Sequence, residues 1–274
     1  MTDRYAIIGN PVAHSKSPEI QASFAHATRQ VLVYERLLAP RDGFRATVDS
    51  FRANGGLGAN VTLPFKVEAF DYAQELTARA QQAGAVNTLK FDGTKIIGDN
   101  TDGIGLCRDI VDNLKFSLTD SRVLLMGAGG AARGVIGPLL AARPECVVVA
   151  NRTQAKADEI VHQFENLGPV QAIGLAALAA QQFDIVINAT SASIGGDMLA
   201  IPASCFRKGA LAYEMMYGKG MTPFMTLAAS AGAQTADGLG MLVEQAAEAF
   251  FVWRGIRPET AGIMTQIRKQ LRGE

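Results

Sequence analysis

The side chains best suited to chemistry lie in short polar segments of the first hundred residues. Ser15 and Ser17 stand between a strand-like and a helix-like run, where hydroxyls and free backbone amides suit a carboxylate. Lys66 falls in the first turn of an expected helix, where its charge opposes the helix dipole. That placement has a mild energetic cost, which is a small argument for a role of Lys66 beyond solubility. These residues therefore indicate recognition of an acid and a functional role for a lysine.

Further polar residues interrupt apolar runs in the same region. Asn60 and Thr62 share one face of an expected strand, Asn87 lies in an apolar run, and Asp102 precedes an expected helix. Each type of residue also has a simpler explanation. Ser17 or Asp102 can cap a helix, Asn87 can be satisfied within a sheet, and Lys66 can be a solvated surface lysine. From the residues alone these alternatives stay open.

A glycine-rich turn at 127–133 indicates a second kind of site. An apolar run ends at Gly127, which permits a sharp turn, and Gly129 lets backbone approach a pyrophosphate at the start of a helix. The next strand-like run, 146–150, ends in Asn151-Arg152-Thr153. An NAD site usually has an acidic residue there for the ribose hydroxyl. An amide and a cation in its place favour the 2′-phosphate of NADP.

Composition limits the classes of function. The chain has 274 residues, is 48% hydrophobic and has a formal net charge of zero, which favours a folded globular protein. Without a basic run we expect no nucleic-acid partner, and without about 20 consecutive apolar residues we expect no membrane span. Three widely spaced cysteines, no signal-peptide pattern and no zinc-type spacing predict a cytoplasmic protein without disulfides or a metal.

Apolar runs alternate with helix-like segments, which predicts an α/β fold with mostly parallel sheet. We expect two α/β domains flanking a cleft, the second a Rossmann-type dinucleotide-binding domain. The expected bounds are 1–101 plus 241–274 for a discontinuous substrate-binding domain and 102–240 for the Rossmann domain. Strands are expected at 4–9, 31–38, 58–63, 85–91, 95–97, 146–150, 183–189 and 210–213. Helices are expected from Pro18, with Ser17 as N-cap, from Pro64, and at 103–114, 239–253 and 259–271.

Nine segments in order and at matching spacing resemble the NADP-dependent shikimate dehydrogenase family, nearly end to end. They are GNPVAHSKSP, GANVTLPFK, AGAVNT, GDNTDG, GAGGAAR, NRT, INATS, YEMMYGKGMTPF and DGLGMLVEQA. The resemblance implies reversible hydride transfer between NADPH and 3-dehydroshikimate, which gives shikimate, in aromatic amino acid biosynthesis. It also implies no partner other than small molecules, and leaves monomer and homodimer open.

The resemblance also implies roles for individual residues. Lys66 and Asp102 match the catalytic pair, and Ser15 and Ser17 match the groups that bind the substrate carboxylate. The matches to other substrate contacts are Asn60, Thr62, Asn87, Asp102, Tyr217 and Gln245. The matches to cofactor contacts are Gly127, Ala128, Gly129, Gly130, Ala131, Asn151, Arg152, Thr153, Lys156, Met215 and Gly240.

Two positions depart from the family pattern, and several alternatives remain. Ala78 replaces an acidic residue of many relatives, and Lys156 replaces a second arginine of some, which softens the expected NADP preference. Lys66 is either the proton-transfer group or a cation that, with Asp102, orients substrate and stabilises charge. The alternative functions are a quinate/shikimate dehydrogenase that uses NAD, and a non-catalytic NADP-binding regulatory protein.

Overall fold

The computed structural model describes residues 2–190, 201–218 and 220–273. The chain forms two compact units, one of Met1–Gly105 with Val243–Ile267 and one of Leu106–Leu242 with Arg268–Glu274. The functional domain bounds expected from the sequence stay a prediction. Of the motif residues, Ser191 and Lys219 lie outside the described residues.

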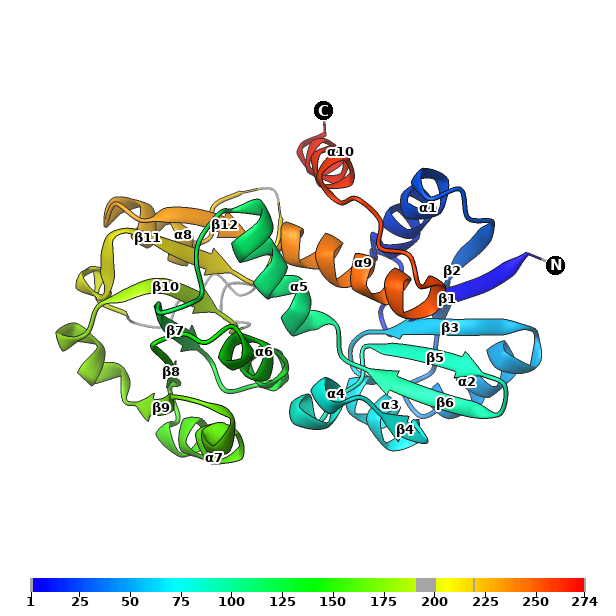
Figure 1. The fold of residues 1–274 in the computed structure, drawn as a ribbon, viewed down its shortest axis with the longest axis horizontal. Coiled ribbons are helices and arrows are strands. Elements are labelled where there is room, and N and C mark those ends of the chain that lie inside the picture. Colours follow the sequence, from blue (N-terminus) through cyan, green and yellow to red (C-terminus); the bar gives the residue numbers. More distant parts are fainter. Residues whose placement is uncertain (1, 191–200, 219, 274) are drawn as a thin grey trace. The chain divides into compact units, whose positions relative to one another are not determined.

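The first unit contains a mixed six-stranded sheet in the order β2-β1-β3-β5-β6-β4 (Figure 1). Its strands are β1 (Asp3–Gly9), β2 (Leu32–Leu38), β3 (Gly56–Val61), β4 (Glu75–Leu76), β5 (Thr88–Asp92) and β6 (Lys95–Asp99). Its helices include α1 (Ser17–Ala27), α2 (Phe44–Ala53), α3 (Lys66–Tyr72) and α4 (Ala78–Ala83). The pairs β3–β5 and β5–β6 are antiparallel, and the other pairs are parallel. One apolar core among the described residues joins β1, β3 and β5 to α2 and α3.

The second unit contains a parallel sheet in the order β12-β11-β10-β7-β8-β9. Its strands are β7 (Arg122–Met126), β8 (Cys146–Ala150), β9 (Val170–Ile173), β10 (Phe183–Asn188), β11 (Phe206–Glu214) and β12 (Gln234–Asp237). Its helices include α6 (Gly130–Ala141), α7 (Gln154–Phe164) and α8 (Pro223–Ser230). Counted from β7, this is the 3-2-1-4-5-6 strand order of a doubly wound dinucleotide-binding fold. The predicted Rossmann-type architecture is confirmed.

Both faces of this parallel sheet are buried along its central strands β7, β8 and β10, which explains why these strands are mostly apolar. Val123 and Leu125 of β7 belong to one core, and Leu124 and Met126 belong to the core on the opposite face. Alternation of side chains across a strand produces this division. The sheet therefore holds the carboxyl end of β7, where the glycine-rich turn begins, on a rigid base.

Three helices contain residues of both units: α5 (Asp102–Arg108), α9 (Leu239–Arg254) and α10 (Ala261–Arg272). The helix expected over 103–114 is α5 followed by a π-helical turn at Asp109–Asn113. No helix among the described residues is long and apolar enough to cross a membrane.

Several expected boundaries were wrong by one or two residues. Lys16, not Ser17, is the N-cap of α1, and its own side chain makes no capping hydrogen bond. The Ser17 amide donates instead to Ser15 Oγ at 3.2 Å. Helix α3 begins at Lys66 rather than at Pro64, because Pro64 and Phe65 form a turn closed by the Phe65 amide and the Thr62 carbonyl at 3.1 Å. The strand and hairpin predictions at 146–150 and around Asp92-Gly93 are confirmed.

Candidate active site

An ion pair between Lys66 and Asp102 lies at the centre of the polar residues of the first unit. Lys66 Nζ donates to Asp102 Oδ2 at 2.6 Å, and Asn87 Nδ2 donates to Asp102 Oδ1 at 2.8 Å. The side chains of Lys66 and Asp102 are 29% and 18% exposed. An ammonium carries three N–H donors, so Lys66 keeps donors for a ligand while Asp102 holds one of them.

Local folding brings Lys66 to this place. The turn before α3 buries Phe65, whose ring stacks on Phe44 with centroids 5.2 Å apart. The Lys66 carbonyl accepts a hydrogen bond from the Val86 amide at 2.8 Å, next to Asn87 in the chain. The helix start and the segment that carries Asn87 are therefore fixed to each other through their backbones.

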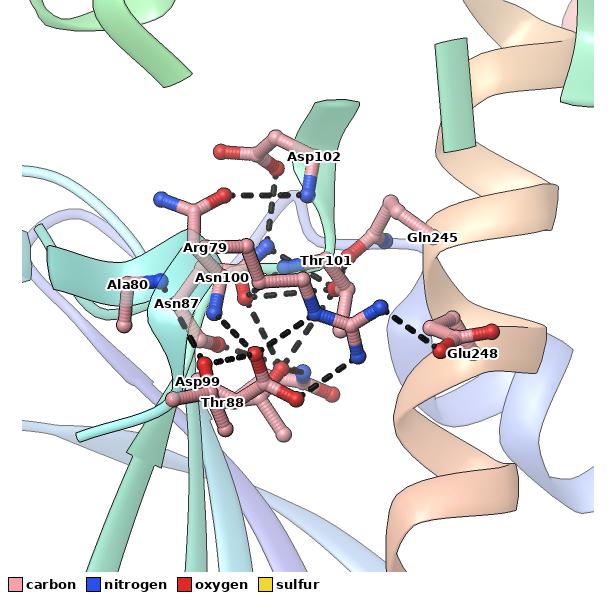
Figure 2. A network of polar contacts seen from close by, with 12 residues as sticks. Arg79, Ala80, Asn87, Thr88, Asp99, Asn100, Thr101, Asp102, Gln245 and Glu248 are labelled. Atoms are coloured by element: carbon pink, nitrogen blue, oxygen red, sulfur yellow. Dashed lines mark hydrogen bonds and ion pairs between the residues drawn. The ribbon is translucent and has the colours of Figure 1, made fainter. Parts of the chain in front are cut away.

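The segment that carries Asp102 is held by buried amide side chains (Figure 2). The Thr101 amide donates to Asn87 Oδ1 at 2.9 Å, and the Asp102 amide donates to Asn100 Oδ1 at 3.1 Å. Asn87 is thus hydrogen-bonded within the protein, as its simpler explanation required, and it also contacts the Asp102 carboxylate. The role of Asn87 as a substrate contact stays a prediction.

The other residues predicted to bind ring hydroxyls, Asn60, Thr62 and Gln245, differ from one another in their surroundings. Asn60, near the end of β3, is buried and accepts from the Tyr34 hydroxyl at 2.7 Å, while its Nδ2 donates to Thr88 Oγ1 at 3.1 Å. Thr62 follows β3 and is half-buried. Gln245, on α9, lies 3.4 Å from Thr101 by its Oε1 atom. Gln245 thus joins the Asp102 segment, whereas the Asn60 amide is used inside the fold.

The two serines form a small polar group at the start of α1. Their hydroxyls are 3.1 Å apart, and Ser17 is buried. Arg36 of β2, which the sequence analysis missed, donates to the Ser15 carbonyl at 2.6 Å and pairs with Glu19 at 2.9 Å. Burial raises the pKa of the nearby Tyr34 hydroxyl well above 10, although a hydrogen bond with Ser17 and the charge of Arg36 oppose this. Two hydroxyls near a guanidinium suit an anion such as a carboxylate.

The glycine-rich turn of the second unit has the geometry that close approach of a phosphate requires. Gly127 has φ +109°, and a Cβ there would lie 3.0 Å from Thr190, beyond the end of β10. A Cβ on Gly129 or Gly130 would meet no described heavy atom within 4 Å, and both residues are exposed at the start of α6. β7 and β10 flank the point where the strand order reverses, which is where doubly wound sheets bind ligands.

Cationic side chains follow the neighbouring strand. Asn151 Nδ2 donates to the Thr153 carbonyl at 2.9 Å, and Thr153 precedes α7 as its N-cap residue. Arg152 and Lys156 are both exposed, near the start of this helix. Exposed cations at a helix N-terminus suit a phosphate group. The open space at Gly129 and these cations fit a dinucleotide that carries a 2′-phosphate. Ala128 and Ala131 complete the turn.

The remaining predicted residues also belong to the second unit. The Met215 amide donates to the Asn188 carbonyl at 3.0 Å, immediately after β11. Gly240, in the first turn of α9, has no room for a Cβ because the Asp109 carboxylate lies against it. Tyr217 follows β11 and is half-buried, and burial raises the pKa of its hydroxyl. Tyr217 therefore does not belong to the unit that contains Ser15, Lys66 and Asp102.

Comparisons with known proteins agree with this division of polar groups. Three family models match the chain: a shikimate dehydrogenase substrate binding domain at residues 7–89, a shikimate/quinate 5-dehydrogenase domain at 109–194, and a shikimate 5'-dehydrogenase C-terminal domain at 238–268. A shikimate dehydrogenase (NADP(+)) from Dechloromonas aromatica is 57% identical over 99% of both chains. The chain belongs to the shikimate dehydrogenase family.

Solved structures of similar proteins support the fold of the family member described here. An Ael1 enzyme from Pseudomonas putida is 49% identical, with a TM-score of 0.93 over 97% of this chain and 98% of that one. A shikimate 5-dehydrogenase from Thermus thermophilus, solved in complex with NADP(H) and shikimate, is 30% identical, with a TM-score of 0.87 over 98% and 100%. The fold predicted from the sequence and the family resemblance are confirmed.

Proposed function

We propose that this chain catalyses the reversible NADPH-dependent reduction of 3-dehydroshikimate to shikimate. The observation that carries the proposal is the Lys66–Asp102 contact of 2.6 Å, with Asn87 on the second carboxylate oxygen. This group occurs in a chain that is 57% identical to a shikimate dehydrogenase (NADP(+)) over nearly its whole length. The first unit is proposed to bind the substrate and the second to bind NADP. The cleft expected between the domains stays a prediction.

In this proposal Lys66 exchanges a proton with the oxygen on the reacting carbon. NADPH supplies the hydride, and the carbonyl oxygen gains negative charge as it arrives. Lys66 donates a proton to that oxygen. Asp102 holds the ammonium in place and accepts a hydrogen bond from a ring hydroxyl. In the reverse direction Lys66 accepts the proton of the alcohol. Ser15 and Ser17 bind the carboxylate, and Asn87, Thr62 and Gln245 bind ring hydroxyls.

The glycine-rich turn and the two cations after β8 are proposed to hold the cofactor. Amides of Gly129 and Gly130 approach the pyrophosphate, and Arg152 and Lys156 pair with the 2′-phosphate. A Lys156 ammonium lacks the planar fork of an arginine, so Arg152 carries most of the discrimination against NAD. Met215 and Gly240 are proposed to contact the nicotinamide, and Tyr217 is proposed as a further substrate contact.

A spectrophotometric assay of NADP⁺ and NAD⁺ reduction, with shikimate and quinate side by side, tests the proposal. We expect rapid reduction of NADP⁺ by shikimate and much slower reaction in the other three combinations. Equal efficiency with NAD⁺ would contradict the cofactor assignment, and faster reaction with quinate would favour a quinate dehydrogenase. Binding of NADPH without any turnover would favour a non-catalytic protein.

The role of Arg152 has its own test. Arg152→Ser is expected to lower kcat/KM with NADP⁺ about tenfold or more, because a charge-assisted contact is lost, and to leave the value with NAD⁺ nearly unchanged. Lys208→Ser, at an exposed cation on β11, is the matched control. An equal loss with both cofactors would show that Arg152 does not read the 2′-phosphate.

A further inference from the structure

An ion network of the half-buried Arg79 and two buried carboxylates lies beside the Asp102 segment and has no role in the chemistry proposed so far. Arg79, on the short helix α4, lies between Asp99 at the end of β6 and Glu248 on α9 (Figure 2). Its Nε and Nη2 atoms donate to the two oxygens of Asp99, each at 2.7 Å. Its Nη1 atom donates to Glu248 Oε1 at 2.8 Å. One guanidinium therefore links two carboxylates that belong to different elements.

The Asp99 carboxylate is fully engaged by donors. It is 3% exposed, and it also accepts from Thr77 Oγ1 at 2.6 Å and from the Asn100 amide at 2.7 Å. Burial by itself raises the pKa of Asp99, but the hydrogen bonds and charge of Arg79, with Thr77 and Asn100, hold it below its usual value. Asp99 thus stays ionised near neutral pH and keeps its two bonds to Arg79.

The position of Asp99 fixes the position of Asp102, three residues further along the chain. Asn100 is tied to Asp99 by its amide and to the Ala85 carbonyl by its side chain at 3.1 Å. Asn100 Oδ1 then accepts the amide of Asp102 at 3.1 Å. Because hydrogen bonds of 2.7 to 3.1 Å connect Asp99, Asn100 and Asp102, a shift of Asp99 is transmitted to the Asp102 backbone.

The other carboxylate, that of Glu248, lies on the same helix as Gln245. Glu248 lies three residues after Gln245 on α9, so the two side chains share one side of the helix. Figure 2 shows both on the side of α9 that faces Arg79 and Thr101. The second oxygen of Glu248 pairs with Arg257, so Glu248 is held from two directions. Gln245 Oε1 lies 3.4 Å from Thr101 Oγ1, next to Asp102 in the chain.

We propose that Arg79 is a positioning residue that sets the spacing between Asp102 and Gln245. It acts through Asp99 on one side and through Glu248 on the other. The inference rests on the proposed function for the identity of the ligand, because Asp102 and Gln245 are proposed there to bind ring hydroxyls. A lysine cannot replace Arg79 in this role, since an ammonium has no planar fork to hold both carboxylates at fixed angles.

The variant Arg79→Lys keeps the charge and removes the fork. We expect the KM for shikimate to rise about tenfold or more, because charge-assisted hydrogen bonds that order the site are lost. The KM for NADP⁺ is expected to stay within about twofold, because its proposed site belongs to the other unit. Backbone amide hydrogen exchange at residues 100–102 is expected to accelerate about tenfold, while exchange in β1 and β3 stays unchanged.

Arg254→Lys is the matched control. Arg254 is 19% exposed against 26% for Arg79, lies on α9, and also bonds several partners, among them Asp3, Tyr5 and Gln30. None of these partners is a proposed site residue, so the KM for shikimate and exchange at 100–102 should stay at wild-type values. A second variant, Glu248→Gln, weakens only the link to α9. It should raise the KM for shikimate by less than Arg79→Lys and leave exchange at 100–102 unchanged.

Two results would overturn the inference. One is Arg79→Lys with wild-type KM for shikimate and wild-type exchange at 100–102. The other is an equal rise in both KM values with faster exchange throughout the first unit, which is what a purely structural role produces. If the wild-type chain fails to oxidise shikimate, the proposed function fails, and the exchange measurement still decides whether Arg79 orders the Asp102 segment.

Discussion

The buried hydroxyl of Tyr213 offers a quantitative test of the second unit. Tyr213, in β11, is fully buried, and its hydroxyl donates to Asp109 Oδ2 at 2.6 Å. The Tyr213 hydroxyl oxygen in turn accepts a hydrogen bond from the Met241 amide at 3.2 Å, in the first turn of α9. Burial raises the pKa of the Tyr213 hydroxyl well above 10, and the charge of Asp109 and the hydrogen bond with it act in the same direction. The hydroxyl therefore stays protonated and donates. Tyr213 therefore connects the sheet, the π-helical turn and the start of α9.

Tyr213→Phe removes this oxygen with little change in volume. Loss of a hydrogen bond to a carboxylate costs about 1.5–3 kcal/mol, and a buried N–H without its acceptor costs about 1–3 kcal/mol. Since the two terms overlap, we expect the free energy of unfolding to fall by about 3 kcal/mol in total. For a unit of this size the midpoint of thermal unfolding should fall by roughly 10 °C.

Urea and thermal unfolding followed by circular dichroism measure this difference. The matched control is Tyr72→Phe in the first unit, where a half-buried tyrosine donates to Asp49 at 2.5 Å. That exposed contact should be worth less than about 1 kcal/mol. A loss for Tyr213→Phe below about 1 kcal/mol would refute the reasoning, because the hydroxyl would then be contributing no more than a surface contact.

Two further predictions concern Asp99 and Gly129. Because the folded-state pKa of Asp99 is lowered, its stabilising contribution is present above its unfolded pKa of about 3.9 and is lost as pH falls through the folded value. Asp99→Asn should therefore lower the free energy of unfolding by about 3–5 kcal/mol at neutral pH. The difference in thermal stability between variant and wild type should shrink below about pH 4, and a constant difference down to about pH 2 would contradict this. Gly129→Val should leave the unliganded midpoint within a few degrees, because a Cβ there meets no described atom within 4 Å, yet weaken NADP⁺ binding by calorimetry about tenfold or more. Gly262→Val, at an open position on α10, is its control, and normal NADP⁺ affinity in Gly129→Val would exclude the turn from the site.

Local patterns predicted much of the fold, because they depend on neighbouring residues. The strand at 146–150 was predicted with its observed bounds, since five consecutive residues are apolar and the polar residues Asn151-Arg152-Thr153 follow them. The hairpin at Asp92-Gly93 was predicted from the preference of glycine for positive φ, which is +59° at Gly93. Helix starts were less accurate, because Pro64 and Ser17 are typical of helix starts but here lie one or two residues from the true N-cap.

The network around the site could not be predicted from local patterns. Arg79 is 20 residues from Asp99 and 169 residues from Glu248 in the chain. In the sequence, each of these three charged residues is typical of a solvated surface position. Arg36 likewise contacts the Ser15 carbonyl only because β2 pairs with β1 beside it. Position within the motifs GANVTLPFK and GDNTDG identified Lys66 and Asp102, but their contact of 2.6 Å required the fold.

In the proposed reaction Lys66 transfers the proton while other residues hold the substrate. The most direct test is turnover and shikimate affinity of Lys66→Ala beside the wild type, by NADPH formation and by equilibrium binding. We predict that kcat falls about 100-fold or more while the Kd for shikimate changes less than about tenfold. A kcat near the wild-type value, with or without a loss of shikimate affinity, would show that Lys66 does not transfer the proton.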